Sequence, residues 1–373
     1  MAADVMIDFR SASTETLLNP RLPRVERSRL QEIRDAAPPL EGHVWLTTSG
    51  SSGPLKLVAL AKEAVLASAA AVNRHLDATP RDVWCCTLPT FHVGGLGVWA
   101  RAELIGGRVV TLDRWSAADF VETASHEGVT LSSLVPAQVS DLVSLNRPAP
   151  PSLRAIVIGG AALPEEIRSR AVSLGWPLLP SFGMTECCSQ IATAALDDAR
   201  SEQEPRLRLL DHLEGRTLDG RLAIRGTSLL TGYAWMEDGV GRFVDPKRDG
   251  WFVSEDVALI EREGGATFIR PEGRSADFLK IGGESTSLGR LDDILARILR
   301  DHPGHDAALI AVSDSRRGKV IHLVVDDPSV AEEIRSRFDA EVLPFERSRQ
   351  LHVAAIPRSP LGKLSRDELV RAL

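Results

Sequence analysis

Apolar and polar positions follow two different patterns along this chain of 373 residues. From residue 44 to about residue 205, short apolar runs alternate with longer segments of helical periodicity, which predicts buried strands connected by helices. The predicted strands are Val44–Leu46, Val83–Leu88, Arg108–Leu112, Leu131–Val135 and Ala155–Ile158. The predicted helices are Lys62–His75, Ala117–His126 and Glu165–Leu174, and residues 17–40 are expected to be partly helical. This alternation predicts an α/β layered fold with largely parallel strands.

The pattern changes after about residue 205, where short strands and glycine turns replace the alternation. Four runs predict a small β subdomain: 221–225, 232–233, 251–253 and 266–269. From about residue 275, a helix near 291–300 and strands at 308–312 and 320–325 predict a compact α+β unit.

Composition is that of a globular protein, with 43% hydrophobic and 25% charged residues. A formal net charge of −7 and the absence of a long basic run disfavour nucleic-acid and anionic-membrane partners. No apolar run is long enough to span a bilayer, and the N-terminus lacks the pattern of a secretion signal. Cys85-Cys86 and Cys187-Cys188 are adjacent pairs, a poor geometry for chelation, so we expect small buried residues in a reducing, cytoplasmic compartment.

Residues 47–56 combine hydroxyl side chains, two glycines and a lysine directly after a predicted strand. Gly50 and Gly53 permit backbone conformations that a Cβ would block, so successive N–H groups can donate to phosphate oxygens. The residues expected to hold a polyphosphate are Thr48, Ser49, Gly50, Ser51, Ser52, Gly53 and the cationic Lys56. Taken alone, the segment is also typical of a serine- and glycine-rich surface turn.

The pattern Thr48-Ser49-Gly50-Ser51-Ser52-Gly53-x-x-Lys56 resembles the phosphate loop of the adenylate-forming superfamily, which contains acyl- and aryl-CoA synthetases, adenylation domains and luciferases. The resemblance implies a large N-terminal α/β domain with layered sheets and a small β subdomain, residues 1–274. A small mobile α+β domain, residues 275–373, would follow. Because 46 residues precede the loop, fewer than the superfamily usually has, we expect an N-terminally trimmed form of this fold.

A second motif, Ser181-Phe182-Gly183-Met184-Thr185-Glu186, resembles the Tyr-Gly-x-Thr-Glu segment of the superfamily. The resemblance implies that Phe182 stacks on adenine and that Gly183 lets the backbone approach the ligand. It also implies that Thr185 bonds a phosphoryl oxygen and that Glu186 binds Mg²⁺. A glutamate in isolation would more often be a solvated or capping carboxylate.

Two further segments resemble later superfamily motifs. Residues 249–256 resemble Gly-Trp-x-x-Thr/Ser-Gly-Asp, which implies that Asp256 accepts hydrogen bonds from the ribose hydroxyls; by itself it would be read as a β-turn acid. Residues 273–284 resemble the hinge, where Arg274 would reach ribose or phosphate and Gly282 and Gly283 would line the CoA channel. Three positions depart from the superfamily pattern: Ala276, Leu288 and Arg290.

The C-terminal segment Pro357–Leu364 resembles the Pro-Arg/Lys-x-x-x-Gly-Lys motif. The resemblance implies that Lys363 stabilises the charge that develops between a carboxylate and the α-phosphate. Without the flanking pattern, a lysine near a C-terminus would be read as a solvated charge.

Two remaining segments are expected to form the acid pocket. Pro89–Leu96 resembles Pro-x-Phe-His-x-x-Gly, which implies that His92 and Gly94 gate the pocket. Gly159, Gly160 and Ala161 leave room for a flat ring, so we expect an aryl acid. Within the superfamily these segments are most similar to the o-succinylbenzoate–CoA ligase subfamily of menaquinone synthesis.

The sequence therefore predicts an AMP-forming acid–CoA ligase that uses ATP, Mg²⁺ and CoA, as a monomer or homodimer. Two alternatives remain open at this stage. One is an adenylating enzyme that loads a carrier protein, and the other is a non-catalytic nucleotide-binding relic. Acid-dependent pyrophosphate release separates the relic from the enzymes.

Overall fold

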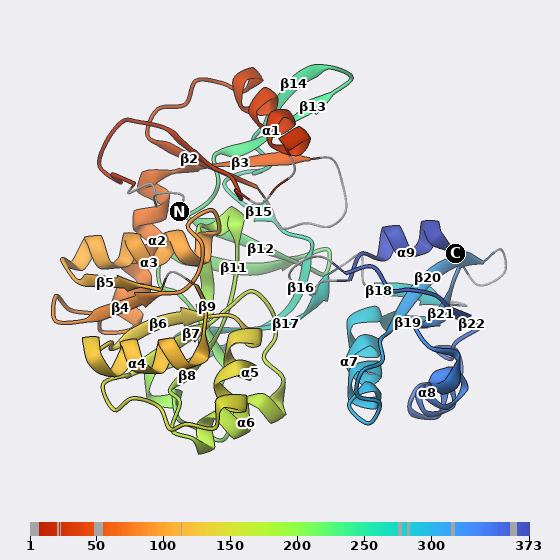
Figure 1. Ribbon diagram of the computed structural model, residues 1–373. Coiled ribbons are helices and arrows are strands. Elements are labelled where there is room, and N and C mark those ends of the chain that lie inside the picture. Colours follow the sequence, from red (N-terminus) through yellow and green to blue (C-terminus); the bar gives the residue numbers. More distant parts are fainter. Residues whose placement is uncertain are drawn as a thin grey trace. The chain divides into compact units, whose positions relative to one another are not determined.

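The computed structural model describes residues 7–20, 22, 24–47, 55–112, 114–274, 278–281, 284–314, 318–358 and 364–373 (Figure 1). These residues form two compact units. The larger contains the described residues up to 271, except residues 255–257, which group with the smaller unit of residues 272–373. The functional division into domains 1–274 and 275–373 stays a prediction. Among the described helices, none is long and apolar enough to cross a membrane.

A five-stranded sheet carries both ends of the predicted phosphate loop. Its strands, in spatial order, are β1 (Glu15–Leu17), β2 (His43–Thr47), β3 (Lys56–Ala61), β13 (Gly232–Glu237) and β14 (Val240–Val244). Trp45 and Leu57 pack against Leu30 and Ile33 of α1 (Arg24–Ala36). Alternate residues, such as Val44, enter the central core on the other face. Both faces of the sheet are therefore apolar, which explains why β2 is an unbroken apolar run.

A nine-stranded sheet has the order β16-β17-β10-β9-β8-β7-β6-β4-β5. Its parallel half consists of β4 (Val83–Cys86), β5 (Arg108–Thr111), β6 (Leu131–Leu134), β7 (Ala155–Ile158) and β8 (Leu178–Met184). The remaining strands are β9 (Ser189–Thr193), β10 (Leu207–Leu209), β16 (Asp256–Glu263) and β17 (Ala266–Arg274). Pairing is antiparallel from β8 to β9, β9 to β10 and β10 to β17. The four strands predicted between residues 83 and 158 are confirmed as parallel neighbours, whereas the first predicted strand, Val44–Leu46, lies in the other sheet and pairs antiparallel with β3.

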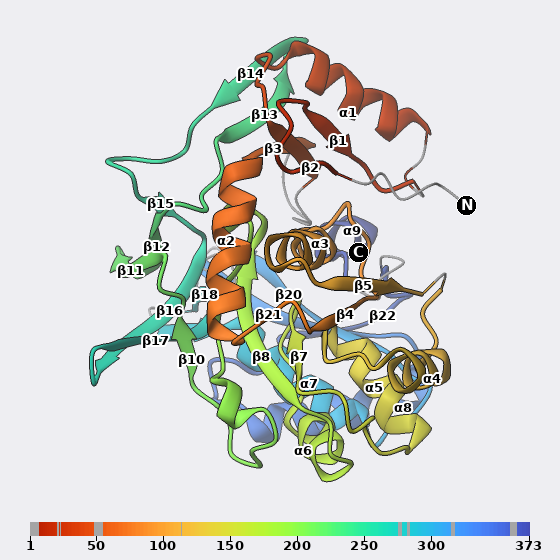
Figure 2. The ribbon, with the colours of Figure 1, turned by 90° about the vertical axis from the view of Figure 1, so that its left-hand side faces the viewer.

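Helices cover both faces of the parallel half (Figure 2). Trp84 and Cys86 pack against α2 (Lys62–His75) and α3 (Val93–Ile105). Cys85 instead packs among residues of three helices on the other face: α4 (Ala117–Glu127), α5 (Pro136–Leu145) and α6 (Glu165–Ser173). Two short 3₁₀ turns, η1 (Thr185–Cys187) and η2 (Leu196–Asp198), flank β9. All four cysteines are buried thiols, as their spacing predicts.

The strands between residues 205 and 274 are divided among three sheets. A separate three-stranded sheet contains β11 (Leu213–Leu218), β12 (Arg221–Gly226) and β15 (Phe252–Val253). β13 joins β3 in the first sheet, and β17 joins β10 in the nine-stranded sheet. Only part of the range predicted as a β subdomain therefore forms a separate sheet. A local pattern identifies a strand but does not identify the distant strand with which it pairs.

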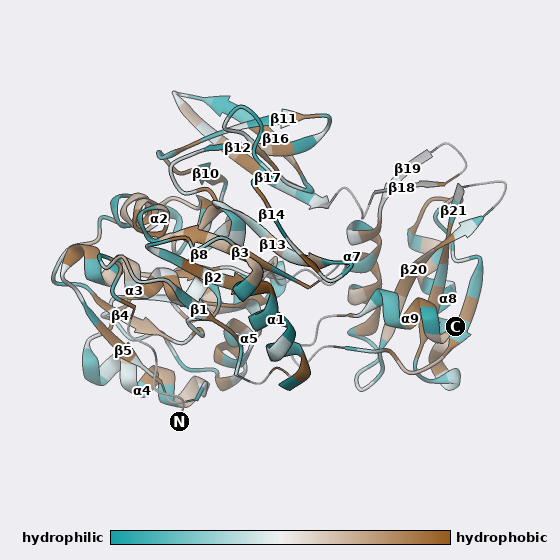
Figure 3. Ribbon diagram, turned by 90° about the horizontal axis from the view of Figure 1, so that it is seen from above, coloured by the Kyte–Doolittle hydropathy of each residue, from teal (hydrophilic) through white to brown (hydrophobic). Residues whose placement is uncertain are grey.

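The smaller unit is a five-stranded sheet with helices on both faces. Its strands are β18 (Phe278–Ile281), β19 (Glu284–Ser287), β20 (Ala307–Asp314), β21 (Gly318–Val325) and β22 (Gln350–Val353). Residues of α7 (Leu288–Leu299) and α8 (Pro328–Glu341) form a core on one face, and Leu369 of α9 (Arg366–Ala372) covers the other. Figure 3 shows β20 in brown, consistent with this double burial. The predicted α/β fold class with an α+β C-terminal unit is confirmed.

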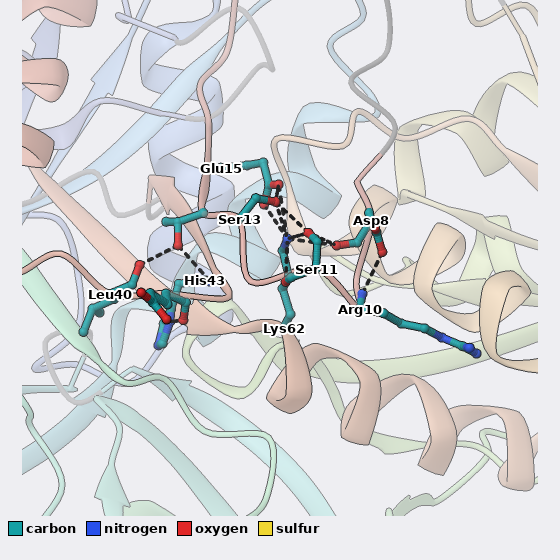
Figure 4. Close-up of polar contacts among 10 residues, drawn as sticks. Asp8, Arg10, Ser11, Ser13, Glu15, Leu40, His43 and Lys62 are labelled. Carbon is teal, nitrogen blue, oxygen red and sulfur yellow. Dashed lines mark hydrogen bonds and ion pairs between the residues drawn. The ribbon is translucent and has the colours of Figure 1, made fainter.

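The N-terminal segment is attached to α2 by a buried lysine (Figure 4). Lys62 is 2% exposed, and its Nζ donates to the Asp8 carbonyl at 2.9 Å and to the Ser11 and Ser13 hydroxyls at 3.0 and 3.1 Å. The Glu15 carboxylate lies 2.9 Å from the same nitrogen and neutralises its charge. This arrangement holds residues 8–15 against the start of α2.

Candidate active site

The predicted phosphate loop joins two paired strands. Thr47, at the end of β2, is opposite Leu57 of β3, so residues 48–56 connect an antiparallel hairpin. Lys56 is the first residue of β3 and is partly buried. Thr48, Ser49, Gly50, Ser51, Ser52 and Gly53 lie outside the described residues, and their contribution stays a prediction.

Lys56 and Glu186 both contact one tyrosine, Tyr233. The Tyr233 hydroxyl donates to Glu186 Oε1 at 2.8 Å, and Lys56 Nζ lies 4.4 Å from the centroid of the Tyr233 ring. Glu186 is in η1, directly after β8, and the backbone N–H of Leu230 donates to its carbonyl oxygen at 2.8 Å. The structure thus brings together residues from the first and second predicted motifs. Sequence analysis missed Tyr233, although it is the single tyrosine of the chain.

The second motif crosses from a strand into a tight turn. Phe182 is in β8 and is partly buried, and a register shift between Phe182 and Gly183 precedes η1. A Cβ on Gly183 would lie 2.0 Å from the carbonyl oxygen of Ser189, so β9 leaves no room for a side chain. This packing gives the glycine a structural reason that the sequence did not indicate, and the approach of a ligand to its backbone stays a prediction. Thr185, the first residue of η1, is partly buried.

The glycine–alanine segment follows β7, at the carboxyl ends of the parallel strands. The Gly159 N–H donates to the Leu134 carbonyl at 3.1 Å, and the Ser181 hydroxyl donates to the Ile158 carbonyl at 2.8 Å. Gly160 has φ +86°, a conformation that favours glycine, and Ala161 is exposed. This edge, outside the carboxyl ends of β6, β7 and β8, is where open α/β sheets bind ligands.

The predicted gate coincides with the start of a helix. His92 is the N-cap residue of α3, its ring lies 4.7 Å from the Phe91 ring, and burial lowers the pKa of its imidazole. Gly94 is the second residue of α3. A Cβ on the next residue, Gly95, would lie 2.3 Å from the Pro89 carbonyl oxygen, so this glycine lets the helix lie against the preceding segment.

The same helix, α3, contains a buried arginine that no predicted motif includes. Arg101 of α3 is 1% exposed, and its guanidinium donates to the hydroxyls of Ser133 at 3.3 Å and Ser189 at 3.4 Å. Its Nε has no hydrogen-bond partner among the described residues, and no described carboxylate pairs with it. Burial lowers its pKa to about 10, so the side chain remains a cation at neutral pH. The available signal was a charged residue in a mostly apolar helix whose one other charged residue is Glu103.

The structure does not test the other predicted site residues. Asp256 is the partly buried first residue of β16, and Arg274 is the last residue of β17. Gly282, Gly283 and Lys363 lie outside the described residues. The roles of all five stay predictions.

The residues present fit a magnesium ion that arrives with a nucleotide. Mg²⁺ usually binds one or two carboxylates and otherwise takes phosphate and water oxygens. Glu186 supplies one such carboxylate, of which Tyr233 holds one oxygen. The described part of the chain contains no cluster of three or more metal-ligating side chains. Glu186 would therefore bind a Mg²⁺ ion whose other ligands are mainly phosphate and water oxygens. The ion would neutralise part of the negative charge of the phosphates.

The described residues combine a layered α/β fold with a lysine at the start of β3 and a hydrogen-bonded carboxylate, both in contact with Tyr233. The model of one family, described as AMP-binding enzyme, matches residues 3–234. The chain belongs to this family, which confirms the superfamily predicted from the motifs.

Characterised relatives agree with this assignment. The chain is 27% identical to a 2-succinylbenzoate–CoA ligase of Bacillus licheniformis, over 96% of this chain and 75% of the relative. A structure of o-succinylbenzoate CoA synthetase from Bacillus subtilis with the acyl-adenylate intermediate OSB-AMP has a TM-score of 0.73 at 26% identity, covering 87% of this chain and 68% of that one. A second structure of that enzyme, with ATP and magnesium ion, has a TM-score of 0.74 at 25% identity, covering 88% and 69%.

Proposed function

We propose that the protein is an ATP-dependent acid–CoA ligase that works through an acyl-adenylate. The observation that carries this proposal is the Lys56–Tyr233–Glu186 group, in which the first residue of β3 after the predicted phosphate loop supplies a cation and η1 supplies a carboxylate. Family membership and the 2-succinylbenzoate–CoA ligase relatives support the same reaction class.

In the first half-reaction, a carboxylate oxygen of the acid attacks the α-phosphorus of ATP. The bond between that phosphorus and the bridging oxygen to the β-phosphate breaks, and pyrophosphate leaves. Lys56 and the loop at 48–53 bind the departing phosphates, Glu186 holds Mg²⁺, and Lys363 stabilises the transition-state charge. Phe182, Thr185, Asp256 and Arg274 hold the adenylate.

In the second half-reaction, the CoA thiol attacks the acyl carbon, the thiol proton is lost, and AMP leaves. Gly282 and Gly283 line the thiol channel after the C-terminal domain, residues 275–373, has rotated. Such alternation lets one pocket serve two steps that need different surroundings.

The acid we propose is o-succinylbenzoate, in a pocket lined by His92, Gly94 and the 159–161 segment. This acid has two carboxylates, of which one reacts and one remains charged. Arg101 supports the choice, because a buried guanidinium without a described carboxylate partner can bind the second carboxylate. An aryl acid with a single carboxylate would leave that cation unneutralised.

The test is a pyrophosphate-release assay with o-succinylbenzoate, with benzoate and with medium-chain fatty acids, each with and without CoA. We expect release to depend on o-succinylbenzoate, and its CoA thioester to form when CoA is present. Adenylate that is transferred to a carrier protein but not to CoA would favour the carrier alternative. ATP binding that does not depend on the acid, without release of pyrophosphate, would favour the non-catalytic alternative.

A variant pair tests the role of Arg101. Arg101→Leu should raise KM for o-succinylbenzoate by about 100-fold while KM for ATP changes little, the scale for losing a buried charge pair. Arg108→Leu, which removes an exposed arginine paired with Glu127, is the matched control. Equal losses for both substrates would indicate that Arg101 acts through folding.

We also propose that the enzyme works in the cytoplasm, as a monomer or homodimer, on small-molecule substrates and without nucleic-acid or membrane partners. The acidic net charge and the buried reduced thiols support this assignment.

A further inference from the structure

Tyr233 lies between the two charged groups of the candidate site. Its strand, β13, pairs with β3, where Tyr233 is opposite Val58 and Trp235 is opposite Lys56. Lys56 is therefore the diagonal neighbour of Tyr233 on the same face of the sheet. Because the phenol has a polar hydroxyl and an apolar ring, it contacts Glu186 with one part and Lys56 with the other.

The contact with Glu186 fixes the direction of its carboxylate. The hydroxyl donates to Oε1 at 2.8 Å, which leaves Oε2 for a cation. A second bond, from the Leu230 N–H to the Glu186 carbonyl at 2.8 Å, holds the backbone of the turn. Both donors belong to residues 230–233, so one segment sets the position and the orientation of this side chain. Hydrogen bonds to metal-binding carboxylates have this effect in other proteins.

The contact with Lys56 gives that cation a place before a nucleotide binds. A lysine ammonium 4.4 Å from an aromatic centroid is attracted by the ring quadrupole. This attraction is weaker than that of a phosphate anion, so a phosphate can replace the ring as the partner of the ammonium. A polyphosphate at the loop would draw the ammonium from the ring onto its oxygens. The ring thus holds Lys56 close to the loop without neutralising its charge.

We propose that Tyr233 is a positioning residue for Mg²⁺·ATP: its hydroxyl orients Glu186, and its ring holds Lys56 until the phosphates bind. The inference rests on the proposed function, since it assigns Glu186 to the metal and Lys56 to the phosphates. It adds a residue outside every motif that the sequence analysis used.

Two substitutions separate the two contacts. Tyr233→Phe removes the hydroxyl and keeps the ring, so the Mg²⁺ concentration for half-maximal pyrophosphate release should rise roughly tenfold, with little change in maximal rate at saturating Mg²⁺. Tyr233→Leu removes the ring as well, and KM for ATP should then rise in addition. Phe243→Leu is the packing control, because Phe243 contacts Trp45 on the opposite face of the same sheet.

A merely structural tyrosine would lower thermal stability in both variants and in the control, with an unchanged Mg²⁺ dependence. That result would overturn the proposal.

The single tyrosine allows a readout that does not need turnover. Uniform incorporation of 3-fluorotyrosine gives one ¹⁹F resonance, from position 233. We expect this resonance to shift on addition of Mg²⁺·ATP, and the nucleotide-free protein to show distinct shifts in Lys56→Met and Glu186→Gln.

The same experiment separates failure of this proposal from failure of the proposed function. A resonance that responds to Mg²⁺·ATP in a protein without acid-dependent pyrophosphate release would retain the positioning role and reject the ligase. Calorimetric binding of Mg²⁺·ATP without any change of the resonance would reject the positioning role alone.

Discussion

Three buried charged side chains differ in how their charges are neutralised. Lys62 has a carboxylate and several oxygens around it, and Asp82 forms two bonds with Arg154. Arg101 has two long bonds to hydroxyls and no described carboxylate partner. Burial of a charge is costly unless a partner compensates, so the first two residues serve stability, whereas the third is the one expected to receive its partner from a substrate.

Lys62→Met should destabilise the larger unit by about 3 kcal/mol, because it leaves Glu15 and the surrounding hydroxyls without their cation. Urea unfolding followed by tryptophan fluorescence measures this unit selectively, since all seven tryptophans lie between residues 45 and 251. The double variant with Glu15→Gln should cost less than the sum of the single variants. Additive losses would show that the two side chains are not coupled.

Asp82 gives the stability of the same unit a defined acid dependence. Burial raises the pKa of its carboxyl, but bonds from Arg154, Thr79 and Thr130 outweigh burial and hold the pKa at about 2. Because the folded pKa lies below the unfolded value, the stabilisation is complete above about pH 4 and is lost as the pH falls toward 2. We expect Asp82→Asn to lower stability at pH 6, with the difference from the natural protein shrinking between pH 4 and pH 2.5. A pH-independent difference would contradict this interpretation.

At the scale of elements, the predicted bounds agree with the structure where the local sequence pattern and the burial of the element favour the same helix or strand. The predictions for α2 and β7 match the structure at both ends, because their local patterns and their burial agree. No helix was predicted over α3, whose first turns contain Gly94, Gly95 and Gly97. Glycine disfavours helices, but here a Cβ at residue 95 would strike the Pro89 carbonyl, so packing overrides propensity.

Ala161, in the segment after β7, gives a test of the acid pocket. Ala161→Leu should raise KM for the acid more than KM for ATP, because the added side chain would occupy space proposed for the flat ring. The side chain is exposed, so the fold should tolerate the change. Steady-state kinetics with each substrate varied in turn measures the effect. A larger effect on ATP would place this segment at the nucleotide instead.

At the scale of the whole molecule, motif order predicted the family, but not the contacts between motifs. The contact between Lys56 and Tyr233 joins residues about 180 positions apart, and no local pattern reports such a pairing. Arg101 was missed for a similar reason, since the burial of one arginine depends on strands and helices from several parts of the chain. The packing constraint on Gly183 was missed because its close neighbour, Ser189, approaches from the next strand.

The remaining prediction at this scale concerns Lys363 and the C-terminal domain. Lys363→Ala should lower acid-dependent adenylate formation by about 100-fold, the scale for losing a charge donor in the transition state. Thioester formation from supplied acyl-adenylate and CoA should change far less, because the lysine is proposed to be withdrawn in that step. Single-turnover measurements of both half-reactions make the comparison. Equal losses in both would remove the support for two alternating arrangements.

The pairing of β3 with β13 also has a consequence for biosynthesis. Lys56 leaves the ribosome long before Trp235, its partner in the register. At roughly 5–20 residues per second, the hairpin that flanks the phosphate loop waits on the order of 10–40 s for the strand that completes its sheet. During that time the β3 edge next to Leu57 and Ala59 is unpaired, and such edges invite association between nascent chains. The proposed nucleotide-binding site should therefore be among the last parts of the larger unit to form, and chaperone demand should be greatest just before residue 237 is synthesised.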